Sequence, residues 1–277
     1  MVILSILTLL GCSGKEPNSE DFPSSGTLSV LTYNIHGLPP AITGDDTTAR
    51  IEQIAPLLSE YDIVGIQEDW MEENRPLLLN GANFPYVDSF TEHLSEEKVY
   101  GAGLTFLSTI EPTANKHLHY DHCNGYTDSA SDCFASKGLQ IETLFMGGEP
   151  LHILNTHLEA GNHDIDSDIR AEQIDTILAE INSVDGAIIL MGDFNMHPDD
   201  PIDLEVLEQL SDAGMSNACW VLDCSEPHHI DQIWFRSGES LTLTLDAWEH
   251  PSHFVDASGV DLTDHPPIVG RFEWESL

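Results

Sequence analysis

Apolar runs and amphipathic segments alternate along most of the chain, as is typical of domains in which helices and strands interleave. Continuous or alternating apolar runs predict strands at residues 28–35, 62–67, 103–108, 139–145, 151–156, 187–191, 230–235, 241–245 and 267–272. Apolar positions three and four residues apart predict helices at residues 47–58, 71–79, 165–181 and 202–210. Because hairpins are also frequent, the pattern predicts an α/β fold: a mixed-sheet sandwich with helices on its outer faces.

Local features refine this prediction. Thr47 or Thr48 is expected to cap helix 47–58, since a side-chain oxygen there can accept from a free backbone N–H. The sequence Gly-Gly-Glu-Pro at residues 147–150 predicts the turn of a hairpin. The wholly apolar strand 187–191 is expected to lie in the middle of a sheet. Because the sequence has no repeat and no second linker, we expect a single domain.

The start of the chain has the pattern of an export signal. An apolar run over residues 2–10 ends in Leu-Leu-Gly-Cys and precedes a polar stretch, and the run is too short to span a bilayer. It resembles a bacterial lipoprotein signal peptide, in which the Cys, here Cys12, is lipidated, although no Lys or Arg precedes the run. The resemblance implies a signal peptide at 1–12, a linker at 13–27 and a domain at 28–277. The protein would be exported and anchored to the cell membrane or outer membrane, or secreted; the alternative is a frayed apolar terminus.

Four further cysteines, Cys123, Cys133, Cys219 and Cys224, are an even number in what would be an oxidising compartment. They allow three pairings, and their short separations favour the bridges Cys123 to Cys133 and Cys219 to Cys224. Zinc is the competing explanation, but neither pair has the two-residue spacing of a typical structural zinc site.

The chain carries 48 Asp and Glu against 9 Lys and Arg, which gives a formal net charge of −39. This composition excludes a broad basic face of the kind that binds nucleic acid through its phosphates. An anionic substrate would need a divalent cation held by carboxylates, because such an ion reverses the local field. Most of the acidity predicts only a solvated, self-repelling surface.

Polar residues cluster at the carboxyl ends of the predicted apolar strands, where layered α/β folds build a substrate crevice. Each has an ordinary explanation by itself, such as a turn, a helix cap or a surface charge. Their co-occurrence predicts one shared site. The residues are Asn34, Glu68, His157, Asp193, Asn195, Asp231, Asp264 and His265.

Seven segments carry a family resemblance. They follow one another between residues 31 and 268. In order, they are Leu-Thr-Tyr-Asn-Ile-His-Gly-Leu, Ile-Val-Gly-Ile-Gln-Glu-Asp, Gly-Leu-Thr-Phe-Leu-Ser, Asn-Thr-His-Leu-Glu, Met-Gly-Asp-Phe-Asn, Asp-Gln-Ile-Trp-Phe and Thr-Asp-His-Pro-Pro-Ile. Their order resembles that of the endonuclease/exonuclease/phosphatase superfamily, which has the deoxyribonuclease I-like fold. The resemblance implies a four-layered α/β sandwich, two mixed sheets face to face with helices outside, and magnesium-dependent cleavage of phosphoesters.

The chemistry of phosphoester hydrolysis suggests roles for these side chains. Glu68 is the expected metal ligand, and Asn34 and Asp264 are expected to assist that metal directly or through water. The metal would be Mg²⁺, with Mn²⁺ and Ca²⁺ as alternatives. His265 is the candidate general base for in-line attack by water, because imidazole titrates near neutral pH, and Asp231 would orient it.

His157, Asp193 and Asn195 resemble the family's phosphate-contacting residues. Asn195 would donate an amide N–H to a non-bridging oxygen. Asp193 beside a phosphate requires a cation or a protonated His to offset its charge.

The segment Asp-Cys-Phe-Ala-Ser-Lys-Gly at residues 132–138 indicates which branch of this superfamily the chain resembles. It resembles a segment of neutral and bacterial sphingomyelinases in which the Lys, here Lys137, is controlled by the Asp and meets the substrate phosphate. Lys137 beside a turn closed by Gly138 is the structural alternative. The residues between Asp231 and Asp264 contain no long aromatic hairpin, and only Trp248 and Phe254 are available there for membrane contact.

The sequence therefore predicts a metal-dependent phosphodiesterase, with a membrane phospholipid headgroup as the favoured substrate. Alternatives are a secreted nuclease, a small-molecule or inositol phosphatase, and a non-catalytic surface binding protein on the same fold. The protein is expected to be a monomer that does not bind nucleic acid. The His-rich segment 117–122 is interpreted as a solvated loop, with a transition-metal site as its alternative.

Overall fold

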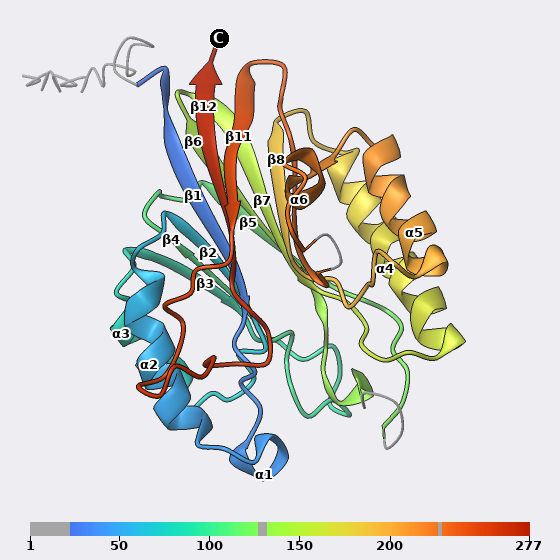
Figure 1. Cartoon of the computed structure of the whole chain (residues 1–277). Coiled ribbons are helices and arrows are strands. Elements are labelled where there is room, and N and C mark those ends of the chain that lie inside the picture. Colours follow the sequence, from blue (N-terminus) through green and yellow to red (C-terminus); the bar gives the residue numbers. More distant parts are fainter. Residues whose placement is uncertain (1–22, 127–131, 227–228) are drawn as a thin grey trace, which may run out of the picture.

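The computed structural model describes residues 23–126, 132–226 and 229–277. In these residues twelve strands form two six-stranded mixed sheets (Figure 1). The first sheet contains, in spatial order, β11 (Leu241–Glu249), β12 (Ile268–Ser276), β1 (Ser25–Asn34), β2 (Ile63–Gln67), β4 (Leu104–Ser108) and β3 (Tyr86–Phe90). The second contains β5 (Ala114–His119), β6 (Gly138–Met146), β7 (Glu149–His157), β8 (Ala187–Asp193), β10 (Asp231–Arg236) and β9 (Ser216–Asn217).

The main core lies between the inner faces of the two sheets. It joins Val30 and Phe106 of the first sheet to Ile153 and Ile189 of the second, all fully buried. A polar link crosses the same interface, because the Asn155 side chain accepts from the Gln67 amide at 2.7 Å and donates to a backbone carbonyl of β2. The link fixes how the ends of β2 and β7 approach each other.

Helices cover the outer face of each sheet, so the molecule has four layers, as predicted (Figure 1). On the first sheet, α2 (Thr47–Leu58) and α3 (Arg75–Ala82) pack through a second apolar cluster. On the second sheet, α4 (Asp164–Ile181) and α5 (Pro201–Asp212) pack through a third. Two short helices, α1 (Pro40–Thr43) and α6 (Ala218–Val221), lie in connections. Among the described residues, no helix has the length and apolarity needed to cross a membrane.

The helix predictions hold with two corrections at helix starts. Helix 47–58 is capped by neither threonine, because the Asp46 side chain accepts from Ala49 N at 3.1 Å. The helix predicted at 71–79 begins later, at Arg75, and ends at Ala82, because Asn83 after it has a left-handed φ of 54°. Pro76 in its first turn favours a start there, since proline needs no backbone donor at that position.

Three strands were not predicted, β3, β5 and the two-residue β9, and all three lie at sheet edges. Their partly exposed, polar residues weaken the alternation from which strands are predicted. The interpretation of segment 117–122 as a loop is therefore wrong for its first part, because His117 and His119 belong to β5.

The cysteine pairing is confirmed, since Cys123 bonds to Cys133 and Cys219 to Cys224. The predicted lipidation site, Cys12, lies outside the described residues. Phe254 is buried against Tyr33, so it is not available for membrane contact.

Candidate active site

The register of the second sheet brings three of the predicted residues side by side. His157 at the end of β7 pairs with Asp193 at the end of the parallel strand β8, and Asp193 pairs with Asp231. Asp231 begins β10 because that strand runs antiparallel to β8. The expectation that the polar residues follow the carboxyl ends of their strands is therefore wrong for Asp231. Asp264 and His265 also precede their strand, β12.

These residues meet at a pocket of about 460 Å³ between the same ends of the two sheets. Seven predicted residues line it: Glu68, Lys137, His157, Asp193, Asn195, Asp264 and His265. The other two lie immediately behind, since Asn34 contacts Glu68 and Asp231 contacts His265. The structure thus brings together all the residues that the motifs singled out.

Asn34 links the two sheets at the floor of the pocket. Its amide donates to Glu68 Oε1 and to Asp193 Oδ2, each at 3.0 Å. Glu68 follows β2 with a left-handed φ of 61°, and its backbone carbonyl approaches Gly37 so closely that a Cβ there would lie 2.1 Å away. The turn after β1 therefore needs glycine to let Glu68 reach the floor.

The protonation of the floor carboxylates is set by burial. Burial raises the pKa of Glu68, the charge of Asp193 adds to this, and the hydrogen bond from Asn34 opposes it. Burial also raises the pKa of Asp193 to about 6, and the neighbouring charge of Asp231 contributes. Both carboxylates are thus destabilised in a pocket without a cation.

Asp231 and His265 form a hydrogen-bonded pair in which Nδ1 of the imidazole faces Asp231 Oδ2 at 2.8 Å. Burial disfavours the charged imidazolium, but the hydrogen bond to Asp231 and the charges of Asp193 and Asp264 outweigh it and raise the pKa of His265 to about 10. Nδ1 is engaged by Asp231, which leaves Nε2 for exchange of a proton with a ligand.

His157 is held in the opposite state. Burial and the positive charges of Lys137 and His265 keep its pKa well below its usual range. Nε2 lies 3.5 Å from Asp193 Oδ2, and Nδ1 is buried without a hydrogen-bond partner among the described residues. A neutral imidazole can donate one hydrogen bond to a ligand without adding charge.

Two donors face the pocket from its second-sheet side. Lys137, which is 5% exposed, donates from Nζ to Asp132 Oδ2 at 2.9 Å and to the carbonyl of Leu158 at 2.6 Å. Asn195 has a left-handed φ of 50° and donates to the same carbonyl at 3.0 Å. The Leu158 carbonyl therefore positions both side chains.

The motif analysis did not single out His36 or the apolar wall of the pocket. Nδ1 of His36 lies 3.2 Å from Asp264 and 3.9 Å from Glu68. Its left-handed φ of 50°, inside the same motif as Asn34, is a backbone signal that a single sequence does not display. The wall contains Leu38, Ile42, Trp70, Tyr100 and Phe134.

The donor set fits a hard divalent cation. Glu68 Oε2 is buried with no hydrogen-bond partner among the described residues, and the destabilised carboxylates around it would gain from a positive charge. Carboxylate oxygens are the ligands that Mg²⁺ prefers. Glu68, Asp193 and His157 also have ligand atoms close enough to share one ion.

The two facing sheets and the outer helices form a deoxyribonuclease I-like α/β sandwich. Residues 31–265 match the model of the Endonuclease/Exonuclease/phosphatase family, and the chain belongs to that family.

Three similar proteins narrow the comparison. A putative neutral sphingomyelinase of Drosophila melanogaster is 27% identical, over 89% of this chain and 60% of that protein. Sphingomyelinase C of Listeria ivanovii is 27% identical, over 92% of this chain and 89% of that protein. A variant of Staphylococcus aureus beta toxin, solved with bound magnesium ions, superposes with a TM-score of 0.67 at 17% identity, over 91% of this chain and all of that one. The chain spans about half to three fifths of the length of the first curated relatives it matches.

Proposed function

We propose that the protein is a metal-dependent phosphodiesterase that hydrolyses the headgroup phosphoester of a sphingomyelin-like phospholipid. The observation that carries this proposal is the place of Lys137. One of nine Lys and Arg in the chain, it lines the pocket opposite a floor of carboxylates and is held by Asp132. A buried ammonium at a pocket wall is a receptor for a phosphate oxygen. The names of the curated relatives support the same substrate class.

The cation would be Mg²⁺, held by Glu68 with Asn34 and Asp264 supporting it, and Mn²⁺ and Ca²⁺ are alternatives. When bound, it would neutralise phosphate charge and offset the carboxylates that hold His265 protonated. Glu68 is fixed for this role by Asn34, and Asp264 approaches the same pocket edge beside His36.

The chain's own residues divide the remaining work. His265 takes the proton of the attacking water at Nε2, and Asp231 fixes the tautomer by engaging Nδ1. Lys137, Asn195 and neutral His157 donate to the phosphoryl oxygens, where negative charge increases in the transition state. Asp193 anchors Asn195 by accepting from its backbone N–H at 3.0 Å.

The apolar wall favours an amphiphilic substrate. Ile42 is 63% exposed at the pocket edge, and Trp70, Tyr100 and Phe134 continue the wall inward. A zwitterionic headgroup is compatible with an acidic protein, whereas nucleic acid is repelled by a net charge of −39. We further propose export and lipid anchoring through Cys12, which would hold the pocket close to a membrane.

The test is release of phosphocholine from sphingomyelin vesicles in Mg²⁺, Mn²⁺ or Ca²⁺, with and without chelator. Parallel assays use phosphatidylcholine, inositol phosphates and plasmid DNA. Metal-dependent phosphocholine release supports the proposal. Failure to cleave any phospholipid in all three metals contradicts it, plasmid cleavage would indicate a nuclease, and inactivity on every phosphoester would indicate a binding protein.

A further inference from the structure

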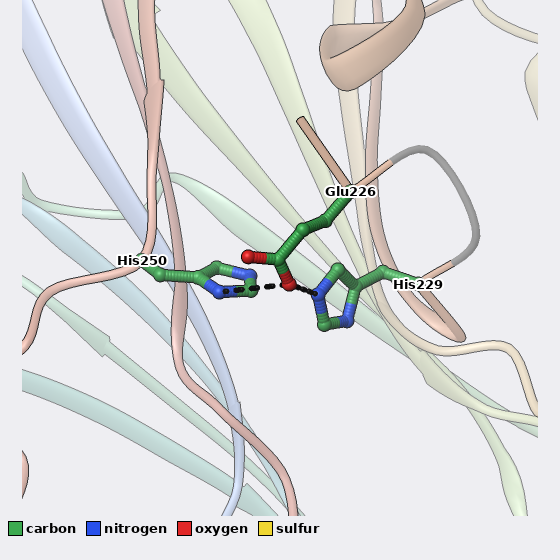
Figure 2. Close-up of side chains that lie close together, drawn as sticks. All are labelled: Glu226, His229 and His250. Carbon is green, nitrogen blue, oxygen red and sulfur yellow. Dashed lines mark hydrogen bonds and ion pairs between the residues drawn. The ribbon is translucent and has the colours of Figure 1, made fainter. Parts of the chain in front are cut away.

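A second cluster of ligand-type side chains lies away from the pocket, between the edges of the two sheets. Glu226 and His229 belong to the connection between α6 and β10, and His250 directly follows β11. Figure 2 shows the three side chains converging, with the Glu226 carboxylate between the two imidazoles. None of the three lines the pocket described above.

The distances are close to those of a metal centre. Glu226 Oε2 lies 2.8 Å from His229 Nε2 and 3.7 Å from His250 Nδ1, and the three ligand atoms lie within 4.8 Å of one another (Figure 2). Ligands bonded tetrahedrally to zinc at about 2.0–2.2 Å are separated by about 3.3–3.6 Å. Movements of about 1 Å, within the reach of side-chain rotation, would bring all three onto one ion.

The surroundings favour the metal-binding forms of Glu226 and His250. The hydrogen bond from His229 lowers the pKa of Glu226, which keeps it a carboxylate. Burial, followed by the nearby charge of His229, lowers the pKa of His250, which keeps that imidazole neutral. Nε2 of His250 is buried without a hydrogen-bond partner among the described residues. The Trp248 ring packs 4.8 Å from the His250 ring and limits its movement.

From this geometry we propose that Glu226, His229 and His250 form a binding site for a transition-metal ion of the zinc class, separate from the catalytic cation. Two imidazoles and one carboxylate suit Zn²⁺, whereas Mg²⁺ prefers a set of oxygen ligands. Three protein ligands leave the fourth position of a tetrahedral ion to water.

Such an ion would cross-link the two sheets at one edge of the sandwich. His250 is attached to β11 of the first sheet, and His229 lies two residues before Asp231, the first residue of β10 in the second. On the N-terminal side of Glu226, the disulfide between Cys219 and Cys224 holds the start of the same connection. The site therefore has a structural role, fixing the connection that leads into β10.

The test measures zinc retained by the full chain after equilibrium dialysis in excess Mg²⁺, which saturates sites built of oxygen ligands. We expect about one zinc per chain in the unmodified protein and in Glu68→Gln. His250→Ala and Glu226→Gln should each weaken zinc binding at least tenfold. The matched control is His253→Ala, because His253 lies three residues further along and pairs with Glu60 at 3.4 Å, outside the cluster.

Two further variants separate this site from other clusters. His157→Ala removes a possible ligand in the pocket, and His117→Ala removes one at the opposite sheet edge. Zinc lost in either of these but retained in His250→Ala and Glu226→Gln would overturn the proposal, as would no retained zinc in the unmodified protein. Glu226 is exposed, so its variant tests the site even if His250→Ala fails to fold.

Discussion

The pocket and the cluster formed by Asp88, His117 and Glu142 contain the same residue types, but only the cluster compensates its own charges. Both combine carboxylates and imidazole in or near the interior. In the pocket, several buried polar atoms have no hydrogen-bond partner among the described residues: Glu68 Oε2, His157 Nδ1 and Asp231 Oδ1. In the cluster, Asp88 accepts from His117 at 2.5 Å and from Gln140 at 3.0 Å, and Glu142 Oε1 lacks a partner.

The difference lies in where the charge is compensated. Burial and the Asp88 charge raise the pKa of Glu142 to about 9, so that Glu142 carries a proton and hydrogen-bonds to Asp88. Although burial opposes ionisation of Asp88, hydrogen bonds from His117 and Glu142 hold the pKa of Asp88 below its usual range. The cluster thus neutralises itself across β3, β5 and β6. The pocket carboxylates face a cavity, and a ligand must supply their compensation.

The largest expected effect is the loss of kcat when the proposed metal ligand, Glu68, is substituted. Glu68→Gln keeps the size of the side chain and removes its negative charge, so we expect phosphodiesterase kcat to fall by about 10³-fold. Glu142→Gln is the matched control, because it makes the same change in a buried glutamate of the self-compensated cluster, and its kcat should stay within about twofold. Steady-state assays in excess Mg²⁺ make the comparison. Equal losses in the two variants would remove the functional distinction between the regions.

The next largest loss of kcat is expected when the candidate general base, His265, is substituted. His265→Ala removes the proton acceptor, and a loss of about 10²- to 10³-fold in kcat is expected, as for other general bases. Asp231→Asn should also lower kcat strongly, because an amide neither carries the charge nor fixes the tautomer with a proton on Nδ1. His117→Ala serves as the control at the other cluster. If His265→Ala retains full activity on every phosphoester tested, another group is the base.

A smaller effect is expected at the phosphate-binding lysine. Lys137→Ala removes one charged donor, and kcat/KM for sphingomyelin should fall by about 10- to 100-fold. Lys116→Ala is the control, since Lys116 is exposed and pairs with Glu180 on the outer surface. The same loss for Lys116→Ala would mean that net charge, and not the place of Lys137, controls binding.

Much of the pocket could be predicted from the sequence because its residues lie at ends of apolar strands, and strand register carries them together. The antiparallel direction of β10, which puts Asp231 at a strand start, depends on long-range pairing. His36 and the wall residues Trp70 and Tyr100 depend on loop conformation. The sequence analysis missed the cluster of Asp88, His117 and Glu142 for another reason: His117 lies on an edge strand whose polar pattern resembles that of a loop.

The smallest expected effect is on stability, and it tests the proton shared in the cluster. The folded pKa of Glu142 is about 9, above the ordinary value of 4.5, so the folded state retains a proton that the unfolded chain releases. Folding stability therefore declines as pH rises from about 4.5 to about 9. Glutamine at this position can still donate to Asp88 and does not ionise. Relative to the unmodified protein, Glu142→Gln should therefore gain stability progressively as pH rises from 5 to 9, measured by urea unfolding. A stability difference that does not change with pH would show that Glu142 is ionised in the folded protein, and that the cluster, like the pocket, depends on an outside charge.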